Sequence, residues 1–161
     1  MTGKTHLAAG ISLGCGLCLV AQPAPLAAVA VLGGATLSSL LPDIDTASSK
    51  LGHRIAPLAW ILRILFGHRS VFHSLAFWAV TSGTIFLIFG NALFAISVFL
   101  GAGSHLLLDM LNPSGIELLW PYKKRISLAR LQCGGIVDHL LTLIFSGTAI
   151  WLGYLYFSVI H

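Results

Sequence analysis

The sequence predicts an all-α integral membrane protein, a bundle of about five transmembrane helices with one short interfacial or re-entrant helix. Two observations predict this class. Hydrophobic residues make up 57% of the 161 residues and charged residues only 9%, whereas a soluble domain is about 25% charged. The apolar residues also gather into runs of helical length, and no stretch long enough for a separate soluble domain remains between them. We therefore expect a single membrane domain, 1–161.

Five apolar runs are long enough, or nearly so, to cross a bilayer, which needs about 20 apolar residues in a helix. We expect these spans at 6–21, 25–41, 75–89, 92–111 and 136–160. Short turns at 22–24 and 90–91 join neighbouring spans, and Ser74 is placed to cap the third one. The run at 55–66 contains Arg63 and is too short to span, so we expect it to lie in the membrane interface or to re-enter the membrane.

The basic residues fall on one side of the membrane if the chain crosses it at each span. That side holds all nine Lys and Arg residues: Lys4, Lys50, Arg54, Arg63, Arg69, Lys123, Lys124, Arg125 and Arg130. The positive-inside rule then predicts a cytoplasmic N-terminus and a C-terminus on the outer side of the membrane. We interpret these residues as topology signals and contacts for anionic lipids rather than for nucleic acid. The sequence leaves the oligomeric state open.

The same topology brings nearly all His and Asp residues to the cytoplasmic side. Polar residues at membrane depth are costly and tend to mark function. The sequence therefore predicts a metal site there, with these candidate ligands: His6, Asp43, Asp45, His68, His73, His105, Asp109 and Asp138. His53 and His139 are on the same side, but the sequence does not decide whether they join the site.

His105 and Asp109 form the most informative local pair, because residues four apart on a helix lie about 5–6 Å apart on one face. They are spaced to chelate one ion, and the alternative is a structural hydrogen bond between them. Asp43 and Asp45 follow the end of a span, where the helix dipole disfavours carboxylates. A cation would compensate for that penalty, although a solvated carboxylate pair is the alternative.

The remaining ligand candidates also have plainer interpretations. His6 enters the membrane with the first span, where an interfacial histidine is equally expected. Asp138 begins the last span, where the helix dipole favours a carboxylate without any metal. His68 and His73 flank a short turn before the third span, and that turn would present two imidazoles to one region.

Mixed His and Asp ligands suit a divalent metal, with zinc expected first and manganese or iron as alternatives. More than four candidate ligands predict either two or more ions, or one ion with supporting carboxylates. We therefore expect roughly one to three ions. Such a site would activate water and clamp a phosphoryl or carbonyl oxygen. In this scheme Asp45 is the base or a bridging ligand, while Arg54 and Arg69 hold a phosphate.

Four segments together resemble the YdjM family of bacterial inner-membrane proteins. They are Leu40-Leu41-Pro42-Asp43-Ile44-Asp45, Phe66-Gly67-His68-Arg69-Ser70-Val71-Phe72-His73-Ser74, Ser104-His105 with Asp109, and Leu118-Leu119-Trp120-Pro121. The resemblance implies a metal-dependent hydrolase. Two departures are that family members often have Gly and Thr where this chain has Ser70 and Phe72, and Glu near the position of Asp138.

More distantly, the pattern is similar to the zinc-dependent phospholipase C and P1 nuclease group, which implies that His105 and Asp109 bind zinc and that the substrate is a phosphoester. We expect hydrolysis of a phospholipid or another membrane-associated phosphoester at the cytoplasmic face. A metal transporter and a non-catalytic membrane protein remain alternatives. The spans hold few mid-membrane polar residues, which counts against transport.

Overall fold

The computed structural model describes residues 1–45 and 71–160, which are mostly helical apart from the irregular 111–135 segment. Its elements are α1 (Gly3–Ala21), α2 (Pro25–Ser38), the 3₁₀ helix η1 (Leu41–Asp45), α5 (Leu75–Phe89), α6 (Ala92–Met110) and α7 (Ile136–Ile160). The described residues contain no β-strand beyond one isolated bridge between Ile116 and Ile126. The all-α prediction is therefore confirmed, while the interfacial helix expected at 55–66 lies outside the described residues.

Four helical segments are long and apolar enough to cross a membrane: Gly3–Ala21, Pro25–Asp43, Ala92–Met110 and Ile136–Val159. The fifth helix, α5, is apolar but has only 15 residues. Large apolar side chains along α7, such as Leu143, Ile150 and Trp151, are exposed. Exposed apolar surface of this extent is expected where a helix faces lipid.

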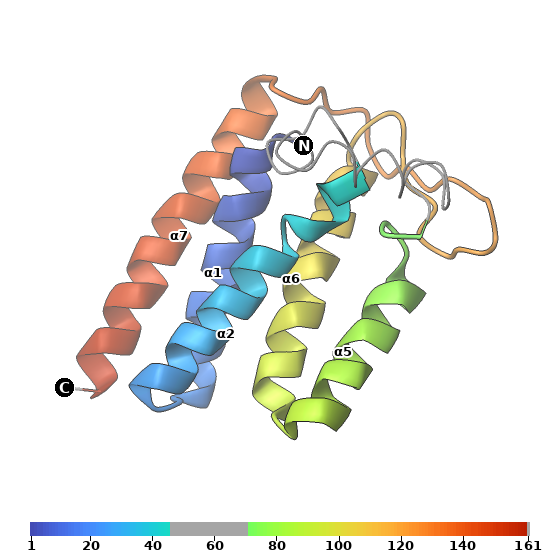
Figure 1. Cartoon of the computed structure of the whole chain (residues 1–161). Coiled ribbons are helices and arrows are strands. Elements are labelled where there is room, and N and C mark those ends of the chain that lie inside the picture. The colour runs from blue at the N-terminus through green and yellow to red at the C-terminus, as the bar shows by residue number, and fades with distance from the viewer. Residues whose placement is uncertain (46–70, 161) are drawn as a thin grey trace.

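The helices alternate in direction along the chain, so the two short turns gather at one end of the bundle (Figure 1). The opposite end, which we call the polar end, holds Met1, η1, the starts of α5 and α7, and the 111–135 segment. Helix α1 packs against α2, α6 and α7, while α6 packs against α1, α2 and α5. Every predicted ligand that the structure describes therefore lies at the polar end, as the alternating topology requires.

The turns at the other end are built by local backbone and capping interactions. Gln22 and Gly90 follow α1 and α5 in the left-handed conformation, with φ of 45° and 64°. Asn91 caps α6 by accepting a 3.0 Å hydrogen bond from the Phe94 amide. At the polar end, Ser74 accepts a 3.1 Å hydrogen bond from the Phe77 amide, which confirms its predicted role as the cap of α5.

A glycine allows the end of α2 to approach α6 closely. A Cβ atom at Gly101 would overlap the Ala35 carbonyl oxygen and the Ser38 hydroxyl. Small residues at such crossings let backbones approach in membrane bundles. The close approach places η1, which follows α2, beside the last turn of α6.

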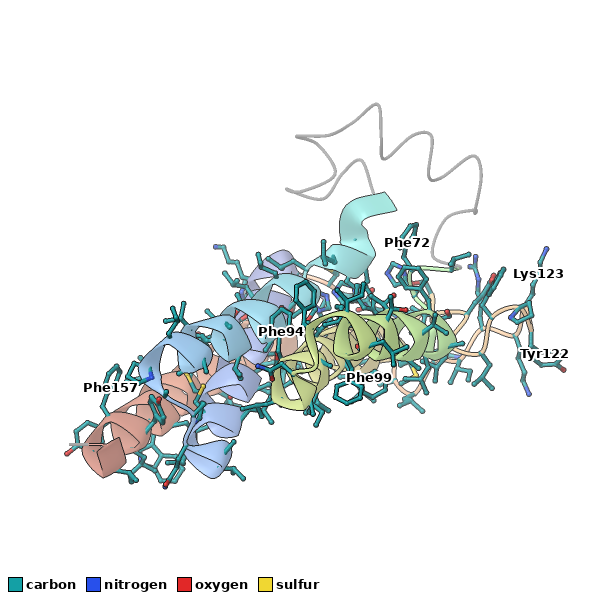
Figure 2. The ribbon with its side chains drawn as sticks, turned by 60° about the horizontal axis from the view of Figure 1, so that its bottom comes forward. Phe72, Phe94, Phe99, Tyr122, Lys123 and Phe157 are labelled. Atoms are coloured by element: carbon teal, nitrogen blue, oxygen red, sulfur yellow. The ribbon has the colours of Figure 1, made fainter. Side chains whose placement is uncertain are left out.

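The 111–135 segment is tied to the bundle at several points. Leu128 donates to the Met110 carbonyl at 2.7 Å, and Leu131 donates to the Leu111 carbonyl at 2.9 Å. The Leu75 amide donates to the Leu118 carbonyl at 2.9 Å, which links this segment to the start of α5. Figure 2 shows Tyr122 and Lys123 on this segment, at the opposite end of the molecule from Phe157.

Basic residues gather at the polar end wherever the structure describes them. They are Lys4, Lys123, Lys124, Arg125 and Arg130. The other four basic residues, Lys50, Arg54, Arg63 and Arg69, lie outside the described residues. The distribution expected from the sequence holds across residues 1–45 and 71–160.

Candidate metal centre

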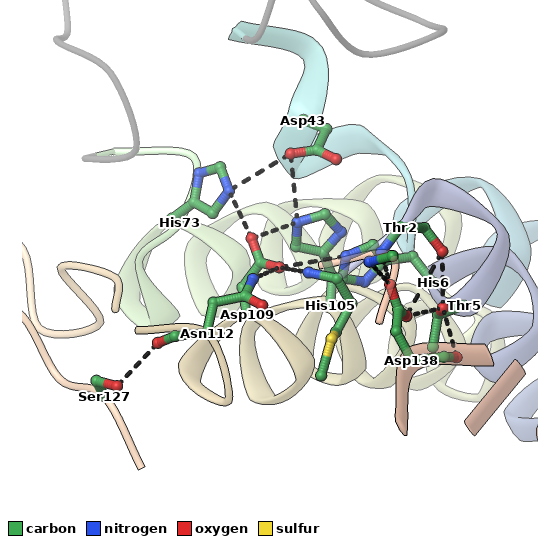
Figure 3. A network of polar contacts seen from close by, with 12 residues as sticks. Thr2, Thr5, His6, Asp43, His73, His105, Asp109, Asn112, Ser127 and Asp138 are labelled. Atoms are coloured by element: carbon green, nitrogen blue, oxygen red, sulfur yellow. Dashed lines mark hydrogen bonds and ion pairs between the residues drawn. The ribbon is translucent and has the colours of Figure 1, made fainter. Parts of the chain in front are cut away.

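Four residues from three segments of the chain meet at the polar end (Figure 3). Asp43 comes from η1, His73 from the turn before α5, and His105 and Asp109 from the last turns of α6. One ligand atom from each lies within 4.8 Å of the others. We call these four residues the Asp–His group.

Two imidazole nitrogens of the Asp–His group face the same two carboxylate oxygens. His105 Nε2 lies 3.7 Å from Asp43 Oδ1 and 3.5 Å from Asp109 Oδ2. His73 Nε2 lies 3.8 Å and 3.6 Å from those same oxygens. The four atoms thus surround a common point although they come from distant parts of the sequence.

These distances suit ligands of one ion better than direct hydrogen bonds. An N–H···O hydrogen bond is about 2.7–3.2 Å long. Two atoms bound at about 2.0–2.2 Å to one tetrahedral ion lie about 3.3–3.6 Å apart. Nε2 of His73 and Nε2 of His105 are buried and have no hydrogen-bond partner. Since buried polar groups are normally satisfied, the arrangement fits a divalent metal.

A backbone carbonyl holds His105 in the tautomer that a ligand needs. His105 Nδ1 lies 2.8 Å from the Ser39 carbonyl oxygen. A carbonyl only accepts, so Nδ1 carries a proton, and in the neutral imidazole Nε2 keeps its lone pair. That lone pair lies on the side of Asp43 and Asp109. Hydrogen bonds of this kind orient metal-binding histidines in many proteins.

The two oxygens of Asp109 have different neighbours. Oδ2 faces His73 and His105, as described above. Oδ1 lies 2.7 Å from the Met1 amino nitrogen and accepts a 3.2 Å hydrogen bond from Asn112 Nδ2. Asp109 is only 2% exposed, so its charge depends on these neighbours.

His6 lies beside the Asp–His group and contacts it from α1. Its ring stacks on that of His105, with centroids 3.8 Å apart and planes 18° from parallel. His6 Nε2 is 3.3 Å from Asp109 Oδ1, and neither ring nitrogen makes a hydrogen bond. The predicted ligand His6 is therefore within reach of the site, on the other side of the Asp109 carboxylate.

The structure places Asp138 in a separate network. Its Oδ2 accepts hydrogen bonds from the backbone amides of Thr2, at 2.9 Å, and Gly134, at 2.7 Å. Its Oδ1 accepts a hydrogen bond from the Thr5 hydroxyl. Asp138 is not a member of the Asp–His group.

The other predicted site residues divide into two sets. His139 is exposed at the start of α7 and is not part of the Asp–His group. Several lie outside the described residues, namely the side chain of Asp45 and the whole of His53, Arg54, His68 and Arg69. Their assignments as ligand, base or phosphate contact stay predictions.

Three contributors to the polar end were not predicted from the sequence: Ser39, Asn112 and Thr5. Asn112 follows Asp109 by three residues, a spacing that places side chains together on a helix and its C-terminal extension. That signal was available in the sequence. Ser39 acts through its backbone carbonyl, and Thr5 acts on a residue 133 positions away. No local pattern reveals contacts of those two kinds.

Comparison with known proteins gives one family and several relatives. The family described as YdjM inner membrane protein matches residues 1–160. The chain is 29% identical to the uncharacterized protein YvsG of Bacillus subtilis over 167 aligned residues, covering 100% of this chain and 98% of that protein. It is 33% identical to the inner membrane protein YdjM of Escherichia coli over 129 aligned residues, covering 76% of this chain and 66% of that protein. The YdjM protein of Shigella flexneri matches with the same values. No solved structure matches the chain.

Proposed function

The chain belongs to the YdjM family of inner membrane proteins, and on this premise we propose that it is a membrane-embedded, metal-dependent hydrolase of phosphoesters. One observation carries the proposal. Nε2 of His73 and Nε2 of His105 lack hydrogen-bond partners and face the same two carboxylate oxygens at 3.5–3.8 Å. Such an arrangement is costly without an ion and ordinary with one.

Asp43, His73, His105 and Asp109 would hold the ion in this proposal. A divalent ion bound there supplies Lewis-acid chemistry, which activates water and polarises a phosphoryl oxygen. The protein contributes orientation, because the Ser39 carbonyl fixes the ring of His105 and Asn112 fixes Asp109. It also limits access, because His73, His105 and Asp109 are buried while the Asp43 side chain is 23% exposed. An incoming substrate would therefore meet the Asp43 side first.

The proposed substrate is a phospholipid or another lipid-linked phosphoester. Its support is the position of the Asp–His group at the polar end, the same end as the exposed basic residues Lys123, Lys124 and Arg125. Basic segments at a membrane surface attract anionic headgroups. Under the positive-inside rule this end faces the cytoplasm. The proposal also includes Asp45 as the base, with Arg54 and Arg69 as phosphate contacts, although these three side chains lie outside the described part of the chain.

Metal content is the first test. Protein purified in detergent without chelator or affinity-tag histidines is expected to hold about one equivalent or more of a divalent metal. Inductively coupled plasma mass spectrometry measures this content. His105→Ala and Asp109→Asn should lose most of it. His139→Ala is the matched control, because His139 is exposed at the same end and lies outside the Asp–His group. Wild-type protein that is folded but takes up no zinc, manganese or iron would overturn the proposal.

Hydrolysis is the second test and uses the same variants. In nanodiscs made from bacterial inner-membrane lipids, the wild type loaded with metal should release a phosphorylated headgroup or phosphate, detected by mass spectrometry of lipid and water-soluble products. His105→Ala should fall to background, and His139→Ala should keep the wild-type rate. If the protein holds stoichiometric metal but turns over no lipid phosphoester, the metal site is supported and the proposed hydrolase activity is rejected.

A further inference from the structure

Asp138 is a fully buried carboxylate at the first turn of α7, and its oxygens are already engaged. The Thr2 amide at 2.9 Å and the Gly134 amide at 2.7 Å both donate to Oδ2, and the Thr5 hydroxyl donates to Oδ1. The Thr2 hydroxyl lies at 3.5 Å from Oδ1 as well. A carboxylate has about four lone-pair sites, so these donors occupy most of its capacity.

Two of these donors, Thr2 and Thr5, lie at the start of α1, whereas Gly134 lies just before α7. Asp138 therefore joins α1 to α7. Thr142, one turn further along α7, strengthens the link: its hydroxyl lies 2.8 Å from the Thr5 hydroxyl and can donate to it while Thr5 donates to Asp138 Oδ1. Figure 3 shows this network on the α7 side of His6, with the Asp–His group on the other side. We call the contacts of Asp138 with Thr2 and Thr5 the α1–α7 clasp.

The clasp sets the rotation of the turn that carries His6. Successive residues on a helix point about 100° apart. With Thr5 held against α7, the next residue is directed toward α6. His6 accordingly stacks on His105 at 3.8 Å and approaches Asp109 Oδ1 at 3.3 Å.

We propose that Asp138 is a positioning residue that holds His6 against the Asp–His group through the α1–α7 clasp, and that it is not itself a metal ligand. The inference rests on the proposed metal site for its functional meaning. The clasp itself stands on the hydrogen bonds of Asp138 with Thr2 and Thr5.

Asparagine at position 138 separates this role from that of a ligand. Both amide donors point at Oδ2, so the side-chain oxygen of an asparagine can accept from both of them. Its NH₂ group then donates to the Thr5 hydroxyl, which can accept as well as donate. Asp138→Asn therefore keeps the clasp, whereas it would remove the charge of a ligand. Asp138→Ala removes every side-chain contact of the clasp and leaves only the 3.4 Å contact of the Thr5 hydroxyl with the backbone carbonyl at position 138.

The test measures metal affinity by competition with a chelator. We expect Asp138→Asn to bind zinc within about threefold of the wild type and Asp138→Ala to bind it about 10–100-fold more weakly, as supporting residues of metal sites do. Asp109→Asn, a change within the Asp–His group, should lose stoichiometric zinc. If Asp138→Asn loses zinc as fully as Asp109→Asn does, Asp138 is a ligand and the proposal is wrong.

A second readout needs no metal and so separates this proposal from the proposed function. In metal-free protein, hydrogen exchange in the first turn of α1 and modification of His6 by diethyl pyrocarbonate should be at least about tenfold faster in Asp138→Ala than in Asp138→Asn. Thr5→Val and Thr5→Ser form a milder pair in case Asp138→Ala does not fold. The valine variant loses the hydroxyl but keeps the Thr2 amide bond, so its exchange and modification should be faster than in the wild type and slower than in Asp138→Ala, and the serine variant should behave like the wild type. If hydrogen exchange in the first turn of α1 and modification of His6 are as slow in Asp138→Ala and Thr5→Val as in the wild type, the clasp does not hold His6 and the proposal is wrong.

Discussion

At the scale of single residues, the polar end is defined by how each charged or polar side chain is held. His105 is oriented by the Ser39 carbonyl, and Asp109 is held by Asn112. Asp138 has the same chemistry as Asp109, yet its oxygens point to backbone amides and a hydroxyl. Residue type alone therefore does not decide which carboxylate faces the other candidate ligands, because the neighbouring donors also direct its oxygens.

Asn112 offers a test of this principle. Asn112→Ala removes the 3.2 Å hydrogen bond to Asp109 Oδ1, so we expect metal affinity to fall by about tenfold while the helices stay folded. The measurement is zinc affinity by chelator competition together with circular dichroism. Asn91→Ala is the control, because Asn91 caps the other end of the same helix. It should cost about 1 kcal/mol of stability and leave zinc affinity unchanged. Equal zinc affinities in Asn112→Ala and the wild type would refute the role of this hydrogen bond.

At the scale of the elements, the site depends on how closely α2 and α6 approach. Gly101 in α6 faces the Ala35 carbonyl and the Ser38 hydroxyl, and η1 with Asp43 follows directly after α2. His105 and Asp109 lie one and two turns beyond Gly101 on the same helix. A shift between α2 and α6 therefore changes the distances from Asp43 to both residues.

Two glycine substitutions in α6 test that dependence. Gly101→Ala should force the helices apart and cost about 1–3 kcal/mol of stability, with weaker metal binding. Gly103→Ala should be neutral or slightly stabilising, because nothing lies within 4 Å of a Cβ atom there. Thermal unfolding in detergent and zinc affinity measure both effects. If the two variants behave alike, the close approach of α2 and α6 does not hold the site.

At the scale of the whole molecule, the alternating direction of the helices places the candidate functional side chains at one end. The Asp–His group, the α1–α7 clasp and the basic 111–135 segment all lie at the polar end, while the turns at 22–24 and 90–91 lie at the other. Neither of those turns contains a Lys or Arg residue. The positive-inside rule predicts that the polar end is cytoplasmic.

Native Cys133 provides a probe of this orientation, because it is exposed in the 111–135 segment whereas Cys18 is buried. We expect Cys133 to resist a membrane-impermeant maleimide in intact spheroplasts and to react after permeabilisation. A Gln22→Cys variant places a thiol at the opposite end and should react in intact spheroplasts. Labelling of Cys133 before permeabilisation would reverse the predicted orientation.

The sequence by itself determined the class of protein and the positions of its helices. The spans expected at 75–89 and 136–160 coincide with α5 and α7, and the one expected at 6–21 begins three residues after α1 does. Hydropathy and turn residues are properties of each segment, so they can be interpreted without knowing what packs beside it. The same alternation assigned the His and Asp residues to one end.

Only the tertiary structure decided which of those residues meet. Asp43, His73 and His105 are about thirty residues apart from one to the next, and their distances depend on how α2, α5 and α6 pack. The separation of Asp138 from the Asp–His group likewise follows from the position of α1 against α7. Contacts between distant segments are set by side-chain packing across the bundle, and no local pattern carries that information.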